Sequence, residues 1–228
     1  MSHPSMVAYR DCQALKKHKA EDGKTVKYSY VLIDYCPYGD FTKLIMSKKI
    51  PNTDQVVRTY FHQLIDGIEF LHENDYAHLD LKLDNILMSD EYGLKIADFD
   101  SCVKVQPEMK ITSEGSCDYR APEIIKKTCE KPHAADIYSA GIMLFVMKNR
   151  FFPCLEGKKV KGKDMHALML DNPKEFWEQW DVLTHGNNNM SQEFKELFML
   201  MVKKDPEERA SIEEVKNSRW YKGPILSQ

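Results

Sequence analysis

The sequence lacks the features that mark several common classes of protein. Its formal net charge is only −3 over 228 residues, so it has no broad electrostatic field to attract nucleic acid, and we expect no nucleic-acid partner. The longest apolar run extends from Tyr138 to Met147, which is too short to span a bilayer and predicts a buried helix. No signal peptide opens the chain. We therefore expect no membrane association.

Cysteine is also sparse, with six residues and no C-x-x-C pair. This pattern argues against a disulfide framework or a zinc site and favours reduced thiols in a soluble intracellular protein, cytoplasmic or nuclear. The sequence shows no repeat, low-complexity tract or interdomain linker. A hydrophobic content of 43% is sufficient to fill the core of one large domain.

Apolar periodicity predicts the main elements of secondary structure. Residues 28–35 are rich in Tyr, Val and Ile and precede Pro37 and Gly39, which predicts a strand that ends in a loop. Apolar residues from Val57 to Leu71 recur every three or four positions, which predicts an amphipathic helix. Two short apolar segments, 86–88 and 94–97, predict a hairpin. The rest of the chain is predicted to be helical, with polar loops at 158–163 and 186–189 and a capping box at residues 211–214.

Polar residues at a characteristic spacing point to a particular chemistry. The segment His78-Leu79-Asp80-Leu81-Lys82-Leu83-Asp84-Asn85 is followed, after the predicted hairpin, by Asp98-Phe99-Asp100. Phosphoryl transfer needs a carboxylate to orient the attacking hydroxyl, a cation to neutralise developing charge and oxygen ligands for Mg²⁺. Asp80, Lys82, and the pair Asn85 and Asp98 would supply these groups.

These motifs resemble those of the protein kinase family, whose catalytic loop is written H-R-D-L-K-x-x-N and whose magnesium loop is D-F-G. The resemblance continues in the family's order through residues 115–123, which end in A-P-E, residues 136–141, which are similar to D-x-W-S-x-G, and residues 205–209, which are similar to D-P-x-x-R. It implies an α+β, protein-kinase-like fold, with a mainly helical C-terminal lobe and a remnant of the small-lobe β-sheet.

The resemblance also implies a division of the chain. Residues 1–36 would form partial small-lobe strands and the hinge, and residues 37–228 the large lobe, with the catalytic loop at 78–85, the magnesium loop at 98–100 and the activation segment at 98–123. Upstream of Asp34 there is no Gly-x-Gly-x-x-Gly and no V-A-I-K strand, so the chain is expected to begin just before the family's fourth small-lobe strand. Because one wall of the ATP site would then be absent, we expect weak or no transferase activity from these residues alone.

By resemblance, the cofactors are ATP and Mg²⁺. Asp80 would be the base or orienter of the substrate hydroxyl, Lys82 would contact the transferred phosphate, and Asn85 and Asp98 would ligate the metal. Adenine would bind the backbone carbonyl of Asp34 and the backbone N–H of Cys36. The remaining nucleotide or substrate positions would be Ile33 at the back of the pocket, Leu87 beneath the base, and Asp40 and Asp84 near the ribose and the peptide. Core packing remains the alternative for Leu87, and solvated surface carboxylates for Asp40 and Asp84.

Four further residues have roles implied by the family. Glu123 and Arg209 would form a buried ion pair, Asp136 would anchor the catalytic loop, and Ser116 would place a hydroxyl near Asp80. Lys82 and Ser116 favour a protein substrate with a Ser or Thr acceptor. Residues near Phe176 and Trp220 look most similar to calcium/calmodulin-kinase relatives. No regulatory partner can be named from the sequence.

Two positions depart from the family's pattern. Leu79 replaces the arginine that binds a phosphate on the activation loop in many kinases, which disfavours switching by phosphorylation at Thr112 or Ser113. Asp100 replaces a glycine and adds a carboxylate near the expected metal site. Two alternative functions stay open: a catalytically silent kinase-like binding module, and a small-molecule phosphotransferase of the aminoglycoside type, which shares H-x-D-x-x-x-x-N but lacks the later motifs.

Overall fold

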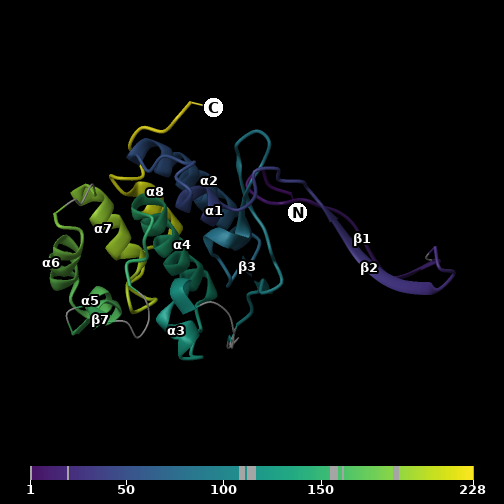
Figure 1. The fold of residues 1–228 in the computed structure, drawn as a ribbon. Helices are drawn as coiled ribbons and strands as arrows, with labels where there is room; N and C mark the ends of the chain where they lie inside the picture. Colours follow the sequence, from purple (N-terminus) through teal and green to yellow (C-terminus); the bar gives the residue numbers. More distant parts are fainter. Residues whose placement is uncertain are drawn as a thin grey trace.

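The structure is a computed structural model that describes residues 2–19, 21–107, 111, 117–154, 159–160, 162–186 and 190–227. A helical body occupies most of the chain, and a long two-stranded ribbon projects from it (Figure 1). The helices are α1 (Phe41–Met46), α2 (Asp54–Glu73), α3 (Pro122–Ile125), α4 (Pro132–Asn149), α5 (Met165–Asp171), α6 (Pro173–Leu183), α7 (Gln192–Met201) and α8 (Ile212–Asn217), with 3₁₀ turns at Leu83–Asn85 and Cys117–Tyr119. The strands are β1 (Tyr9–Lys19), β2 (Thr25–Ile33), β3 (Tyr76–Ala77), β4 (Ile86–Met88), β5 (Leu94–Ile96), β6 (Val103–Lys104), β7 (Lys159–Val160) and β8 (Lys163–Asp164).

Helix α4 is the centre of the body. The residues from Ala135 to Lys148 are all buried, as expected for a helix that is apolar on every side. Pro132 occupies its first turn, and Arg150 ends it in the left-handed conformation with φ 60°. Helix α7 approaches so closely that a Cβ at Gly141 would lie 2.9 Å from the Cβ of Met201. The prediction of a buried helix over 138–147 is confirmed.

Helix α2 leads the chain toward the segment predicted as the catalytic loop, residues 78–85. Thr53 caps its first turn by accepting a hydrogen bond from the backbone N–H of Val56. Its buried face includes the predicted apolar positions at Val57, Phe61, Leu64, Ile65, Ile68 and Leu71. The amphipathic helix predicted for this segment is confirmed, and the chain then passes through β3 into the loop that begins at His78.

Strands β4 and β5 form the predicted hairpin, in which Ile86 pairs with Ile96. The N-terminal segment runs parallel to β5, because Met6 forms a parallel β-bridge with Ile96 in which the backbone N–H of Val7 donates to Ile96 O at 2.9 Å and that of Ile96 donates to Ser5 O at 2.7 Å. The hairpin therefore fixes Asn85, which precedes it, relative to Asp98, which follows it.

The C-terminal helices α7 and α8 each begin at a serine cap. Ser191 caps α7, and Ser211 and Glu214 form the predicted capping box of α8. The polar loop predicted at 158–163 instead contains the short antiparallel pair β7 and β8. Gly162, with φ 82°, gives this segment the left-handed backbone that a tight hairpin needs. Residues 187–189 of the second predicted loop lie outside the described residues.

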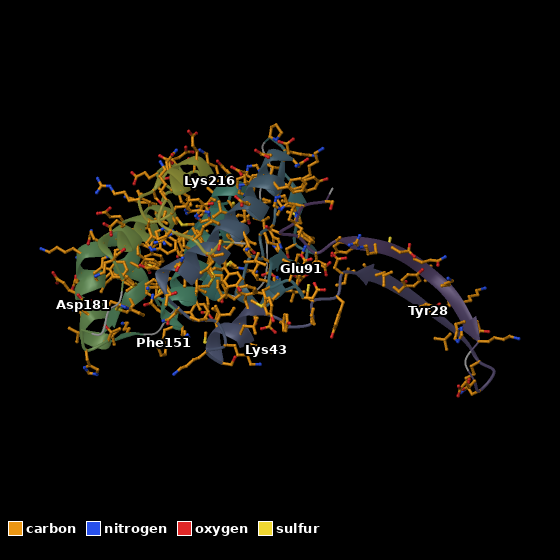
Figure 2. The ribbon with its side chains drawn as sticks, turned by 90° about the horizontal axis from the view of Figure 1, so that it is seen from above. Tyr28, Lys43, Glu91, Phe151, Asp181 and Lys216 are labelled. Carbon is orange, nitrogen blue, oxygen red and sulfur yellow. The ribbon has the colours of Figure 1, made fainter. Side chains whose placement is uncertain are left out.

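The ribbon consists of β1 and β2, which pair in antiparallel register from Tyr9–Ile33 to Lys19–Thr25. Every residue of β1 and nearly every residue of β2 is exposed, and Figure 2 shows Tyr28 far from the helical body. The strand predicted at 28–35 therefore exists, but it begins and ends earlier in the chain. β1 was hard to predict because it contains several lysines and an irregularity between Gln13 and Lys16, where Leu15 has φ 55°.

The mixed helical and strand content agrees with the predicted α+β class. No helix in the described part of the chain combines the length and the apolar character needed to cross a bilayer.

Candidate functional site

The segment predicted as the catalytic loop, residues 78–85, alternates buried and accessible side chains. Leu79, Leu81 and Leu83 are buried in the core, whereas Asp80 and Lys82 are half-buried and Asp84 is exposed. The three leucines thus fix the backbone from one side and leave the polar side chains on the other. This alternation explains how a short loop without regular structure can hold charged groups in a fixed arrangement.

Three of the predicted site residues are in direct contact. Lys82 Nζ donates to Asp80 Oδ2 at 2.7 Å. Asn85 Nδ2 donates to the same carboxylate oxygen at 3.0 Å and to Asp80 O at 2.9 Å. These bonds occupy Oδ2 and leave Oδ1 of Asp80 as the oxygen that can accept a proton or a hydrogen bond from a ligand hydroxyl.

Asp136 on α4 holds the start of the loop. Its Oδ2 accepts from the backbone N–H of His78 and its Oδ1 from that of Leu79, both at 2.8 Å. His72 Nε2, from the last turn of α2, lies 2.9 Å from Oδ2. Burial alone would raise the pKa of Asp136, but its hydrogen bond to His72 and the charges of His72 and His78 outweigh burial, so its pKa lies below the ordinary value. The loop is therefore tied to the centre of the protein by a carboxylate that stays ionised.

Asn85 and Asp98 are brought close by the β4–β5 hairpin. The backbone N–H of Ala97 donates to Asn85 O at 2.9 Å, and His78 Nε2 lies 3.1 Å from Ala97 O. Asp98 is exposed and has φ 62°, a left-handed conformation that Asp tolerates better than most residues. The ring of Phe99 packs on His78 at a centroid distance of 5.3 Å.

These oxygen donors suit a magnesium ion that is shared with a nucleotide. Within the described residues, no hydrogen bond or ion pair occupies the Asp98 carboxylate, and Asn85 keeps its side-chain oxygen free of protein partners. The same part of the chain contains no group of three or more His, Cys, Asp or Glu residues that could hold a metal. Mg²⁺ typically takes only one or two carboxylates together with substrate phosphates and water, so the donor set fits.

The predicted hinge lies at the base of the ribbon. Asp34 accepts from Arg10 Nε at 2.6 Å, and this bond lowers its pKa below the ordinary value. Its backbone N–H donates to Ala8 O at 3.1 Å. Burial raises the pKa of the Cys36 thiol, which argues against a reactive thiolate at this position. The backbone carbonyl of Cys36 accepts from Gly39 N.

Two further predicted residues meet beside the hinge. Asp40 forms an isolated β-bridge with Leu87, and Gly39 O accepts from Met88 N at 2.9 Å. Asp40 also caps α1 by accepting from Lys43 N, and it pairs with Lys43 Nζ at 2.8 Å. Leu87 is half-buried, so part of its side chain stays accessible. Asp84 is exposed, and no described hydrogen bond joins it to Asp40.

Sequence reasoning missed two residues near the site. Lys95 pairs across the hairpin with Leu87. Its positive charge adds to the lowering of the Asp34 pKa and opposes the effect of burial, which still raises the Cys36 pKa, so Lys95 lies close to the hinge. His72 supports Asp136, as described above. The predicted hairpin places Lys95 opposite Leu87. No local sequence pattern indicates that α2 ends against Asp136.

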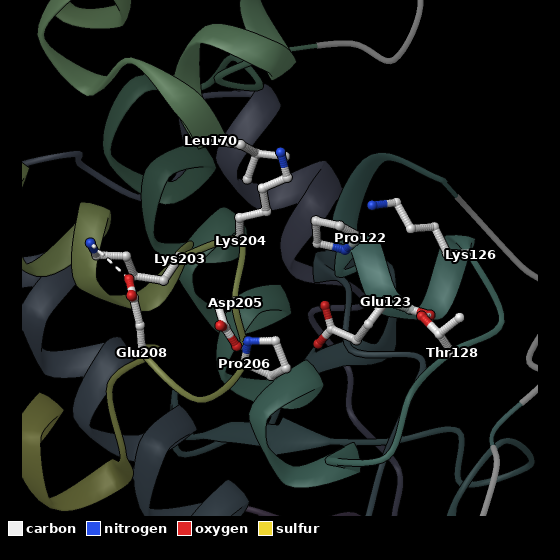
Figure 3. Close-up of a pocket in the computed structure, with 10 residues that line it drawn as sticks. All are labelled: Pro122, Glu123, Lys126, Thr128, Leu170, Lys203, Lys204, Asp205, Pro206 and Glu208. Atoms are coloured by element: carbon white, nitrogen blue, oxygen red, sulfur yellow. Dashed lines mark hydrogen bonds and ion pairs between the residues drawn. The ribbon is translucent and has the colours of Figure 1, made fainter.

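Glu123 and Arg209 form a buried, bidentate ion pair. Arg209 Nη1 lies 2.5 Å from Glu123 Oε1, and Nη2 lies 3.0 Å from Oε2. The guanidinium also donates to Ala134 O and Lys203 O. Figure 3 shows the cavity of about 520 Å³ beside Glu123, where Lys203 and Glu208 form a second, more exposed ion pair. Neither Asp80 nor Asn85 lines this cavity. The Glu123–Arg209 ion pair therefore belongs to the scaffold and lies apart from the candidate site.

The two departures from the family's pattern differ in their surroundings. Leu79 is 6% exposed and belongs to the hydrophobic core. Its side chain therefore cannot bind a phosphate as the family's arginine does at this position. Asp100 is exposed and lies in a turn, and Asp98 rather than Asp100 has the positive φ. The predicted site residue Ser116, like Thr112 and Ser113, lies outside the described residues.

Comparisons with known proteins show which family this chain resembles. A family model described as "Protein kinase domain" matches residues 1–221. CBL-interacting protein kinase 26 of Oryza sativa is 30% identical over 198 residues, covering 85% of this chain and 37% of that protein. The cell cycle serine/threonine-protein kinase CDC5/MSD2 of Saccharomyces cerevisiae is 30% identical over 227 residues, covering 98% of this chain and 29% of that protein.

The SNF-related serine/threonine-protein kinase of Homo sapiens is 31% identical over 197 residues, covering 85% of this chain and 24% of that protein. The chain thus spans between 24% and 37% of the length of these three relatives. The family match extends over nearly the whole chain, and it contains the loop in which Asp80, Lys82 and Asn85 are in contact. The chain belongs to the protein kinase domain family.

Proposed function

We propose that this chain performs ATP-dependent phosphoryl transfer to serine or threonine hydroxyls of protein substrates. The observation that carries the proposal is the contact of Lys82 and Asn85 with one oxygen of Asp80, in a loop whose backbone is held by Asp136. Preorganised charges of this kind stabilise a transition state without having to reorganise during the reaction.

Each residue then has a distinct role. Asp80 Oδ1 accepts the hydrogen bond, and later the proton, of the substrate hydroxyl as its oxygen bonds to the γ-phosphorus and the bond to the β-phosphate oxygen breaks. Lys82 places a positive charge beside the transferred group. Asn85 and Asp98 would hold Mg²⁺, which when bound neutralises charge on the phosphates. Leu79, Leu81 and Leu83 keep these side chains in place from beneath.

The nucleotide would lie between the hinge and the hairpin. We assign adenine to the Asp34 carbonyl and the Cys36 N–H, with Leu87 beneath the base and Ile33 at the back of the pocket. The β-bridge between Asp40 and Leu87 supports this assignment, because it fixes the hinge segment against the hairpin. Asp40 and Asp84 would contact the ribose or the peptide. Residues 1–36 and 37–228 would then be the small-lobe and large-lobe portions, respectively.

Serine and threonine are favoured over tyrosine because Lys82 follows Asp80 by two residues, and because the relatives reported above that are named for their substrate are serine/threonine kinases. Ser116 would stand near Asp80. Leu79 argues against control by an activation-loop phosphate, since a buried leucine cannot bind an anion. The 228 residues contain no Gly-x-Gly-x-x-Gly and no V-A-I-K lysine, so we expect slow turnover from this chain by itself.

The test is phosphate transfer from radiolabelled ATP with Mg²⁺ to a generic basic protein, together with calorimetric binding of Mg²⁺–ATP. Asp80→Asn should abolish transfer while nucleotide binding persists, and Asp98→Asn should weaken binding of the nucleotide when Mg²⁺ is present. The control is Glu178→Gln, on an exposed residue of α6, which should change neither. Transfer by Asp80→Asn at the wild-type rate would overturn the assignment of Asp80, and robust turnover by wild type would overturn the expectation of slow transfer.

One observation favours a second candidate, a catalytically silent binding module. Ile33 is 44% exposed at the end of β2, and both strands of the ribbon leave their side chains open to solvent. A nucleotide bound between the hinge and the hairpin would therefore be covered by protein on one side only. Binding of Mg²⁺–ATP without any transfer would favour this candidate, whereas transfer that depends on Asp80 would exclude it.

A further inference from the structure

A groove on the helical body carries a concentration of negative charge. It has a volume of about 780 Å³ and lies between the last turn of α2, the segment before α4 and the start of α8. Six glutamates line it, against only two cations, Lys131 and Arg209. We call this surface the acidic groove and define it by those six residues, which are Glu69, Glu73, Glu130, Glu207, Glu213 and Glu214.

Half of the glutamates in the acidic groove already have partners. Glu69 pairs with Lys216, Glu207 with Lys131, and Glu214 with the Ser211 cap. Arg209 is committed to Glu123. Within the described residues, Glu73, Glu130 and Glu213 have no ion pair, and all three are exposed. The groove therefore presents three uncompensated carboxylates around a floor that includes the apolar side chains of Val105, Ile137 and Ile212.

The tip of the ribbon has the opposite charge. Lys17 and Lys27 are direct cross-strand partners, and Lys19 lies opposite Thr25 two pairs further along. Since side chains alternate between the faces of a strand, these three lysines share one face, which we call the lysine face. All three are exposed, and in the described part of the chain none pairs with a carboxylate. Like charges placed directly opposite each other destabilise a strand pair, so an anionic surface laid against this face would relieve the repulsion.

The ribbon can reach another molecule more easily than its own groove. At about 3.3 Å per residue, Lys17 lies roughly 25 Å along β1 from Tyr9. Figures 1 and 2 show the ribbon pointing away from the helical body throughout its length. The lysine face is therefore available to a partner in solution, and it is carried by the same chain that carries a complementary groove.

We propose that two copies of this chain associate by placing the lysine face of one ribbon in the acidic groove of the other. Lys17, Lys19 and Lys27 would meet Glu73, Glu130 and Glu213, three cations against three carboxylates that have no ion pair within the described residues. We take a second copy as the occupant because the complementary surface, three exposed carboxylates without an ion pair in the described residues, lies on this same chain. The proposal does not depend on phosphoryl transfer.

Charge reversal on each surface provides a matched test by sedimentation velocity. The ribbon variant is Lys17→Glu with Lys27→Glu, and the groove variant is Glu73→Lys with Glu130→Lys. Each variant alone would carry two surfaces of the same sign, so its association constant should fall at least tenfold. An equimolar mixture should associate again, because each variant then offers the surface that the other needs. The control exchanges Lys174→Glu and Glu178→Lys, both exposed on α6, and should associate as wild type does.

Salt provides a second readout. Association of the wild type should be strong at 0.1 M and lost at 1 M salt, because the Debye length shortens from about 10 Å to about 3 Å. A wild-type chain that stays monomeric at 0.1 M, a ribbon variant that associates normally, or a mixture that stays monomeric would each overturn the proposal. So would binding of single-stranded DNA through Lys17 and Lys27 by a monomeric wild type. Far-UV circular dichroism checks that the exposed substitutions leave the fold intact.

Discussion

Replacing Glu123 by glutamine should destabilise the protein far more than an equivalent change on the surface. The side chains of Arg209 and Glu123 are 0% and 8% exposed, respectively, so the guanidinium cannot turn to water when the carboxylate is lost. Glutamine keeps the shape of Glu123 and one acceptor oxygen but removes the charge. The substitution therefore removes the charge and one of the two hydrogen bonds of the bidentate contact without opening a cavity.

The expected magnitude follows from what remains around Arg209. Removing one partner of a buried ion pair typically costs about 3–5 kcal/mol. Here the guanidinium keeps its hydrogen bonds to Ala134 O and Lys203 O and its position over the ring of Tyr138 at 5.2 Å. These contacts compensate part of the buried charge, so we expect about 3 kcal/mol, the lower end of the range.

Equilibrium unfolding in urea measures this loss. With a slope of roughly 3 kcal/mol per molar urea, the upper end for small domains, the midpoint should fall by about 1 M. The matched control is Glu207→Gln. Glu207 also pairs with a cation, Lys131, but its side chain is 65% exposed, so the control should lose less than about 1 kcal/mol.

A double substitution separates the pair from the unpaired charge. Arg209→Met combined with Glu123→Gln removes the buried cation, and it should be more stable than Glu123→Gln alone, because an apolar side chain needs no counter-charge. A loss below 1 kcal/mol for Glu123→Gln, or a double variant less stable than the single one, would refute the reasoning that an uncompensated buried cation dominates the effect.

Three more predictions follow from the scaffold. Asp136→Asn should destabilise the protein at pH 7, and the loss should shrink as the pH falls below the ordinary Asp pKa of about 3.9. A carboxyl whose native pKa is lowered contributes its full stability above the unfolded pKa and loses it as the pH falls through the native value. Urea midpoints at pH 7 and at a series of pH values below about 3.9 test this. Gly141→Ala should cost about 1–3 kcal/mol, since the added methyl group would lie 2.9 Å from the Cβ of Met201, and an unchanged melting temperature would contradict it. Ser211→Ala should cost about 1 kcal/mol and lower the melting temperature by about 2–4 °C, with no effect expected from Ser101→Ala, which caps no helix.

The sequence by itself determined the local structure and the order of the motifs. The apolar periodicity of α2, the continuous apolar run of α4, and the caps at Ser191 and Ser211 are local patterns, and local sequence is enough to select those elements. The alternation of Leu79, Leu81 and Leu83 with Asp80 and Lys82 likewise follows from residue order, which also places Asn85 before the hairpin and Asp98 after it.

The tertiary structure decided which distant groups meet. Only the packing of α2 against α4 brings His72 to Asp136 and Asp136 to the backbone of the catalytic loop. The ribbon projects from the body, and the glutamates of the acidic groove come together, because of contacts between distant segments. Local propensity does not predict such contacts. The packing of the whole core selects the side-chain contacts between residues far apart in the chain. Local patterns in one sequence do not specify that packing.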